Sequence, residues 1–144
     1  IIIRTAWLYS EFGNNFLKTM LRLTAEKESL NVVFDQVGTP TYAGDLALVI
    51  FSIIEGNLYA GNEGVYHFSN EGVCSWYDFA KAIVELAEHK CQVLPCKSDE
   101  RPTRAKRPRY SVLSKQRVIT ETNTTLRPWK EALVEVVNRI KSEL

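Results

Sequence analysis

The first sixteen residues constrain the fold of this 144-residue chain more than any other stretch. Ile1, Ile2 and Ile3 form a β-branched run, residues 4–9 turn polar and aromatic, and the segment then reaches Gly13. A β-branched run without polar alternation is typical of a parallel strand that helices cover on both faces. We therefore predict a buried strand of an α/β sheet at residues 1–3. Because a central strand of this kind seldom comes first, we expect the rest of that sheet to precede Ile1.

Three side chains follow this strand at the edge where a ligand would bind. Ligands of open α/β sheets collect in the crevice at the carboxyl ends of the strands, and Thr5, Trp7 and Tyr9 stand there. The indole of Trp7 is well placed to stack on a sugar or a base, although packing at the rim of the sheet explains its position equally well. Trp76 and Trp129 open later helices, where we expect packing against the core.

Strands and helices alternate along the remaining chain, which favours the α/β class. The apolar spacing and the capping residues predict helices at about 15–28, 41–54 and 75–89, a last helix that opens at 128–129 and keeps an apolar side as far as Ile140, and strands at 30–35, 65–69 and 92–95. Asn14 or Asn15 is the expected cap of the first helix and Thr41 that of the second, and Ser75 with Asp78 forms a capping box for the third. The second helix is apolar nearly all round over residues 46–54, so we expect a sheet to bury it.

Composition and charge exclude several classes of protein. A net charge of +1 gives no electrostatic basis for binding nucleic acid or a membrane surface, and no apolar stretch approaches the length of a membrane span. The three cysteines, Cys74, Cys91 and Cys96, form no Cys-x-x-Cys pair, which favours reduced thiols in the cytoplasm. His89 with Cys91 and Cys96 fits no standard zinc spacing, so we expect no metal site.

The chain also lacks the motifs of several enzyme classes. Its seven glycines never fall into the Gly-x-Gly-x-x-Gly spacing, and no Gly-Lys-Ser/Thr phosphate loop is present. We therefore expect that the chain alone does not bind NAD(P). Neither His67 nor His89 lies near a serine in a nucleophile elbow, so a hydrolase triad is unsupported.

The irregular segment 98–109 is rich in positive charge. It carries Arg101, Arg104, Lys106, Arg107 and Arg109. Two interpretations stay open: a solvated loop, or a clamp for an anionic ligand. The second is possible because one arginine guanidinium group can donate two parallel hydrogen bonds to phosphate oxygens. Aromatic residues are not interleaved with these cations, as a nucleic-acid stacking platform would require.

Seven motifs together resemble the C-terminal half of the dTDP-4-dehydrorhamnose reductases, which are extended short-chain dehydrogenase/reductases. They include Arg-Thr-Ala-Trp-Leu-Tyr at 4–9 and Asp-Gln-Val-Gly-Thr-Pro-Thr at 35–41. The others lie at 13–16, 20–21, 64–68, 75–80 and 107–113, so the resemblance covers essentially the whole chain in order. It implies a Rossmann-like fold of which residues 1–12 carry the end of the large sheet and residues 13–144 form the sugar-nucleotide lobe.

The resemblance also implies how function is divided. The family reduces the 4-keto group of a dTDP-sugar with NADPH or NADH, and its cofactor turn and catalytic Tyr-x-x-x-Lys pair precede the first motif. No catalytic residue is therefore expected at or after Ile1, and the chain alone should be inactive. Carried over residue by residue, the substrate contacts are Trp7, Asn15, Gln36 and Thr41, and the cofactor contacts are Ala6 and Leu8.

Two further expectations follow from the same resemblance. Some members hold magnesium between subunits through glutamates, but Gly44 and Arg139 stand near those positions here, which argues against that metal site. The isolated chain should also self-associate, because its first strand and neighbouring helices would lack the half that covers them.

Two alternatives belong to other functional classes. A non-catalytic regulatory subunit, like that of methionine adenosyltransferase, would share the fold and would lack an intact glycine-rich turn and Tyr-x-x-x-Lys pair upstream. A free-standing binding domain would require the reading frame to start near Ile1, and the absence of an initiator methionine counts against it.

Overall fold

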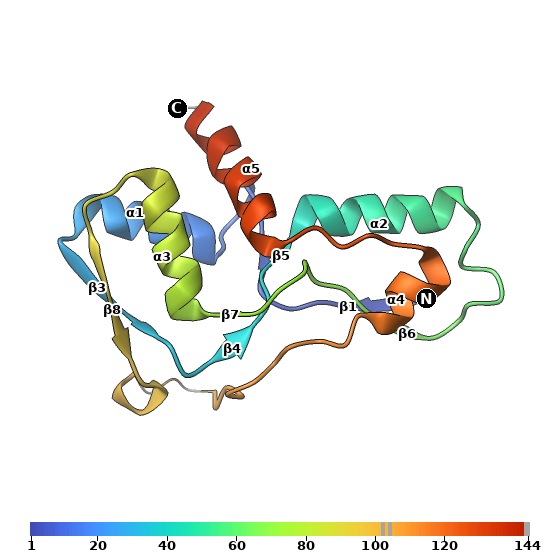
Figure 1. Ribbon diagram of the computed structural model, residues 1–144, viewed down its shortest axis with the longest axis horizontal. Coiled ribbons are helices and arrows are strands. Elements are labelled where there is room, and N and C mark those ends of the chain that lie inside the picture. Colours follow the sequence, from blue (N-terminus) through green and yellow to red (C-terminus); the bar gives the residue numbers. More distant parts are fainter. Residues whose placement is uncertain (102, 104, 143–144) are drawn as a thin grey trace.

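The computed structural model describes residues 1–101, 103 and 105–142, in which helices and short strands alternate (Figure 1). This alternation confirms the α/β class. The helices are α1 (Phe16–Glu26), α2 (Ala43–Glu55), α3 (Trp76–Ala87), α4 (Gln116–Thr122) and α5 (Trp129–Ser142), with a 3-10 turn, η1 (Ser98–Glu100). The strands are β1 (Ile2–Arg4), β2 (Leu8–Tyr9), β3 (Ser29–Val33), β4 (Val37–Gly38), β5 (Thr41–Tyr42), β6 (Val65–His67), β7 (Cys74–Ser75) and β8 (Gln92–Cys96).

The described strands pair two by two, and three of the four pairs are parallel. β1 pairs with β6, β2 with β5 and β3 with β8, whereas β4 and β7 run antiparallel. The longest ladder is β3 with β8, where Ser29 lies opposite Gln92 and Val33 opposite Cys96. Parallel neighbours need a crossover connection, and helices lie between the partners of the β1–β6 and β3–β8 pairs.

The elements gather in two groups on either side of α5 (Figure 1). α1 and α3 lie against the β3–β8 ladder at one end, and α2, α4 and the β1–β6 pair form the other end. β2, β4, β5 and β7 lie between the groups. The carboxyl end of β1 therefore leads directly into the region where the two groups meet.

An aromatic cluster around Phe79 fills the core where α1, α3 and α5 meet. The Phe79 ring is fully buried, and the rings of Tyr9, Phe16 and Trp129 lie with their centroids 5.3, 5.6 and 5.8 Å away. Trp129 is 5% exposed, which confirms its predicted packing role. Trp76 also packs on Phe79, at 6.5 Å between centroids. Contacts of this kind add to the burial of the rings and hold α1, α3 and α5 together.

Two of the three predicted helix caps are confirmed. Asn15 Oδ1 accepts a hydrogen bond from the Lys18 amide at 3.1 Å, and Ser75 and Asp78 form the expected reciprocal box. The predicted Thr41 cap is wrong. α2 begins after Tyr42 without a side-chain cap, because the Thr41 hydroxyl donates instead to the Ala6 carbonyl at 2.6 Å.

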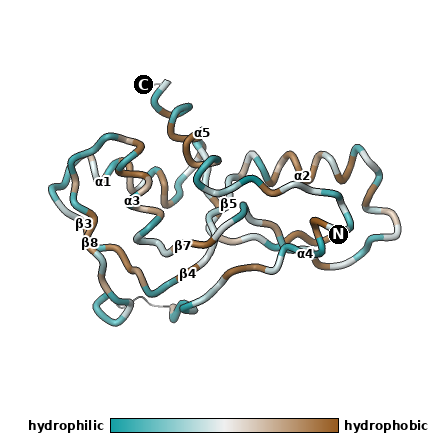
Figure 2. Tube along the Cα trace, in the orientation of Figure 1, coloured by the Kyte–Doolittle hydropathy of each residue, from teal (hydrophilic) through white to brown (hydrophobic). Residues whose placement is uncertain are grey.

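Two burial predictions are wrong for this chain. Ile2 in the first strand is 63% exposed, because β1 has one partner strand and no helix covers it on both faces. α2 carries hydrophobic residues along its length (Figure 2), and several of them are exposed. Leu48, Phe51 and Ile54 are 66%, 60% and 62% exposed, and among its residues only Ile53 is buried. No sheet in the described part of the chain packs against that side of the helix.

None of the helices within the described ranges is long and apolar enough to cross a membrane.

Candidate functional site

Trp7 lies where β1 ends, and its backbone and ring are both tightly held. The residue adopts φ +52°, a left-handed conformation that costs an ordinary side chain about 1–2 kcal/mol. Its indole stacks on that of Trp76 with centroids 3.6 Å apart and planes 12° apart. Gly38 lies so close that a Cβ atom there would approach Trp7 Cε2 to 2.7 Å. Strain of this kind is typical of residues that are held in place for function.

A cavity of about 200 Å³, the Trp7 cleft, opens beside this stacked pair. Its lining residues come from four separate segments of the chain: Ala6, Trp7, Gln36, Trp76, Arg107, Pro108 and Ser111. The segment that carries Ser111 is fixed to β4, because the Ser111 amide donates to the Val37 carbonyl at 2.8 Å. The structure therefore brings three of the sequence-predicted residues, Ala6, Trp7 and Gln36, into one cleft.

A larger cavity of about 560 Å³, the basic cleft, lies next to it and shares Gln36 and Arg107 with it. Its lining residues are mostly charged or polar: Phe34, Asp35, Gln36, Lys97, Ser98, Asp99, Arg101, Thr103, Lys106, Arg107 and Arg109. Five of them are cationic and two are carboxylates, so the described lining carries a net charge of five minus two, or +3. Pro102 and Arg104 of the basic segment lie outside the described residues.

This charge favours the anion-clamp interpretation of the basic segment over a merely solvated loop. The arginines and lysines at 97, 101, 106, 107 and 109 all line the same hollow, although each of them is exposed. A diphosphate has the charge and the several acceptor oxygens that such a set of donors can satisfy.

Gln36 lies at the junction of the two clefts and is only 9% exposed. Its Nε2 donates to Ser98 Oγ at 2.9 Å. Ser98 in turn donates through its hydroxyl and its backbone amide to Asp35 Oδ1, at 2.7 and 3.0 Å. The hydrogen bond from the Ser98 side chain is the largest cause that lowers the pKa of the Asp35 carboxyl.

The other three predicted contact residues do not line either cleft. Asn15 uses its side chain to cap α1 and to bond the Ser10 carbonyl at 2.8 Å. Thr41 is fully buried, and its hydroxyl accepts from Thr5 Oγ1 at 3.1 Å and donates to Ala6. Leu8 lies in β2, opposite Thr41, with 49% of its surface exposed. Their roles in ligand binding stay predictions.

Sequence reasoning missed Trp76, Ser98 and Ser111 as parts of the site. Trp76 was expected only to pack, yet the stack on Trp7 makes it one wall of the cleft. Ser98 lies 62 residues from Gln36 in the chain, and Ser111 lies 74 residues from Val37. No local pattern links residues at these separations.

A third hollow, of about 720 Å³, lies between the ends of α1 and α3. Glu26, Glu28 and Glu88 line it together with Lys27 and Lys90. Its charges are mixed, and His89 at its rim is already bonded through Nδ1 to Thr24 Oγ1 at 2.8 Å. The arrangement has no convergent set of donors or acceptors, so we do not assign a ligand to it.

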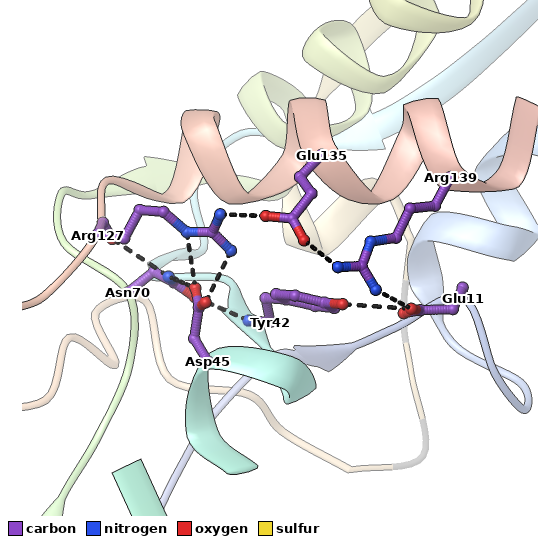
Figure 3. Close-up of polar contacts among 7 residues, drawn as sticks. All are labelled: Glu11, Tyr42, Asp45, Asn70, Arg127, Glu135 and Arg139. Atoms are coloured by element: carbon purple, nitrogen blue, oxygen red, sulfur yellow. Dashed lines mark hydrogen bonds and ion pairs between the residues drawn. The ribbon is translucent and has the colours of Figure 1, made fainter. Parts of the chain in front are cut away.

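A network of ion pairs joins α5 to α2 and to the loop after β2 (Figure 3). Arg127 bonds Asp45 with two nitrogens, at 2.7 and 3.2 Å, and also pairs with Glu135. The network continues from Glu135 to Arg139 at 2.6 Å and from Arg139 to Glu11 at 3.4 Å. Hydrogen bonding from Arg127 is the main cause that holds the pKa of Glu135 below its usual range.

The residues of this region do not fit a magnesium site. Gly44 offers no ligand, and a Cβ atom there would approach the Tyr42 ring to 2.5 Å. The Arg139 guanidinium occupies the space beside Glu11 and Glu135, and it would repel a divalent cation. Within residues 1–101, 103 and 105–142, no three His, Cys, Asp or Glu side chains are grouped to hold a metal ion.

Comparison with known proteins identifies the family of this chain. Residues 1–142 match the family model described as "RmlD substrate binding domain". The chain is 43% identical to the spore coat polysaccharide biosynthesis protein SpsK of Bacillus subtilis, over 98% of this chain and 48% of that protein.

Two crystal structures of dTDP-4-dehydrorhamnose reductases are similar to the chain in fold and in sequence. One, from Clostridium acetobutylicum, has a TM-score of 0.88 and 45% identity, over 97% of this chain and 48% of that one. The other, from Bacillus anthracis in complex with NADP, has a TM-score of 0.86 and 42% identity, over 96% and 47%. The chain thus spans about half the length of these relatives. The match over nearly all of its residues shows that it belongs to the RmlD substrate binding domain family.

Proposed function

We propose that this chain is the substrate-binding part of a dTDP-4-dehydrorhamnose reductase, which reduces dTDP-4-dehydro-L-rhamnose to dTDP-L-rhamnose with NADPH. The observation that carries the proposal is the pair of adjoining clefts. An aromatic cleft beside a cationic one suits a ligand with a sugar at one end and a diphosphate next to it. The names of the similar proteins from Clostridium and Bacillus anthracis support the same activity.

The two clefts suggest how the substrate would lie. The flat wall of Trp7 and Trp76 would pack on the apolar face of the deoxysugar, as aromatic side chains do with apolar surfaces. The cations of the basic cleft, Arg107 and Arg109 among them, would bind the diphosphate. The contribution of this chain is positioning, which holds the keto carbon where hydride can reach it.

The residues of this chain fit only one end of the cofactor. Ala6 lines the Trp7 cleft, and the half-exposed Leu8 offers apolar surface nearby in sequence, which suits the nicotinamide end. NADPH would supply the hydride when bound. The phosphates would need the glycine-rich turn that this sequence lacks, and we place that turn and the Tyr-x-x-x-Lys pair in the preceding half of the protein.

No observation favours the regulatory-subunit alternative, because the two structures reported above are both of reductases.

The three cysteines are unpaired and buried, which supports a reducing compartment and hence the cytoplasm.

The proposal is tested by an assay of the full-length protein and of the 144-residue chain side by side. The full-length protein should consume NADPH when dTDP-4-dehydrorhamnose is added, and NADH in its place shows the cofactor preference. The chain alone should consume none, because we place the phosphate-binding turn for NADPH and the acid in the preceding half. Turnover by the chain alone, or none by the full-length protein, would contradict the proposal.

We also propose that the preceding half covers the outward side of α2 and the β1 strand. The isolated chain should then self-associate, because Ile2, Leu48, Phe51 and Ile54 would otherwise stay in water. Sedimentation velocity should show dimers or larger species that dissociate on dilution, and an apolar dye should bind. A monomer that binds no dye would contradict this, and the full-length protein serves as the control.

A further inference from the structure

The orientation of the Gln36 side chain decides what the junction of the two clefts can bind. A glutamine amide presents a donor on one side and an acceptor on the other. Here Nε2 lies 2.9 Å from Ser98 Oγ. Whether the nitrogen or the oxygen of the amide faces Ser98 depends on whether the Ser98 hydroxyl accepts or donates at that position. The partners of Ser98 settle this question.

Ser98 has a single hydroxyl hydrogen, and Asp35 takes it. The hydroxyl lies 2.7 Å from Asp35 Oδ1, and the Ser98 amide reaches the same oxygen at 3.0 Å. These hydrogen bonds lower the pKa of the Asp35 carboxyl, so it is ionised at neutral pH and can only accept. Ser98 Oγ is therefore left as an acceptor, and only the NH₂ group of Gln36 can satisfy it.

The carbonyl oxygen of Gln36 consequently points away from Ser98. Among the described residues no donor is bonded to this oxygen, and Gln36 lines both clefts. The oxygen is not one of the described side-chain atoms that are shut off from solvent without a partner. A donor group on a ligand at the junction can therefore reach it.

We propose that Asp35 and Ser98 are positioning residues that hold the Gln36 carbonyl oxygen toward the clefts, where it accepts a hydrogen bond from a hydroxyl of the bound sugar. This inference rests on the proposed function. The diphosphate offers only acceptors, so it cannot supply the donor. Gln36 and Arg107 both line the two clefts, and at that junction a sugar on the Trp7 wall would join its phosphate and present its neighbouring hydroxyls.

Binding to full-length variants tests the proposal, with dTDP-rhamnose and dTDP as ligands in calorimetry. In Ser98→Ala the amide is free to turn, so dTDP-rhamnose should bind about 3- to 10-fold more weakly, the worth of one hydrogen bond. dTDP, which lacks the hexose, should change less than about twofold, since it makes no such bond. Ser98→Thr keeps the hydroxyl and should restore the binding of the sugar nucleotide.

Ser142→Ala is the matched control. It makes the same substitution at an exposed serine at the end of α5, whose hydroxyl donates to the Arg139 carbonyl at 2.8 Å and which lines neither cleft. It should bind both ligands as the unaltered protein does. Unchanged binding of dTDP-rhamnose by Ser98→Ala would overturn the proposal. An equal loss for dTDP would overturn the sugar hydroxyl as the donor.

A measurement without ligand tests the orientation by itself. The side-chain amide protons of Gln36 should exchange slowly with water in the unaltered protein and in Ser98→Thr, and quickly in Ser98→Ala. Equal exchange in all three would overturn the orientation. If the full-length protein bound neither ligand, the proposed function and the sugar contact would both fail, whereas this measurement would still decide how the amide is held.

Discussion

Replacement of Phe79 by alanine should lower the free energy of unfolding by about 3–5 kcal/mol, the cost of removing a buried phenylalanine ring. Phe79 is fully buried, and the rings of Tyr9, Phe16 and Trp129 all pack on it. Helices α1, α3 and α5 surround it, so its cavity cannot close without moving one of them. Chemical denaturation of the full-length protein, followed by tryptophan fluorescence, measures the loss.

Phe12→Ala is the matched control, because the same atoms are removed from a ring that is 75% exposed. Its effect should stay within about 0.5 kcal/mol, as for most surface substitutions. Equal losses for the two variants would show that Phe79 does not hold the core together. Trp76 and Trp129 both contact the Phe79 ring, so the fluorescence of the folded Phe79→Ala protein should shift as well.

Local signals explain why the helix starts could be predicted. Asn15 and the Ser75–Asp78 pair act within their own turn, so spacing along the sequence was enough to find them. α4 escaped prediction because it has seven residues, of which only Val118 and Thr122 are buried. Two-residue strands such as β4 and β7 leave no periodic pattern to detect.

Apolar patterning predicted burial for two segments that are largely exposed in this chain. The runs at residues 1–3 and 46–54 were expected to be buried, yet most of α2 and two of the three isoleucines are exposed in this chain. Hydrophobicity is a property of one segment, whereas burial depends on a partner. The spacing that predicted burial therefore now supports the proposed contact with the preceding half.

The candidate site likewise has residues that the sequence could predict and residues that it could not. The end of a predicted strand located Trp7, and the resemblance added Ala6 and Gln36, which the structure brings to the same cleft. The groups that fix these residues come from distant parts of the chain, as Ser98 does for Gln36. Such partners depend on the tertiary fold, so one sequence without the structure cannot reveal them.

Gly38→Ala should disturb the site without removing any group from it. Gly38 lies in β4 opposite Cys74, and an added Cβ atom would approach Trp7 Cε2 and Cζ2 to 2.7 and 2.8 Å and Ser111 Oγ to 2.8 Å. The indole must therefore move from its place on Trp76. We expect the free energy of unfolding to fall by about 1–3 kcal/mol through overpacking. We also expect kcat/KM of the proposed full-length reductase to fall about 100-fold, because a displaced wall would misplace the sugar that we propose it binds.

Gly13→Ala separates this effect from a general loss of stability. Gly13 has φ +63° and nothing within 4 Å of an added Cβ, so alanine there costs about 1–2 kcal/mol through backbone strain alone. The two stacked indoles should give a coupled signal in circular dichroism that Gly38→Ala loses and Gly13→Ala keeps. If Gly38→Ala retained both this signal and the unaltered kcat/KM, the Trp7–Trp76 stack would not be the wall that positions the sugar.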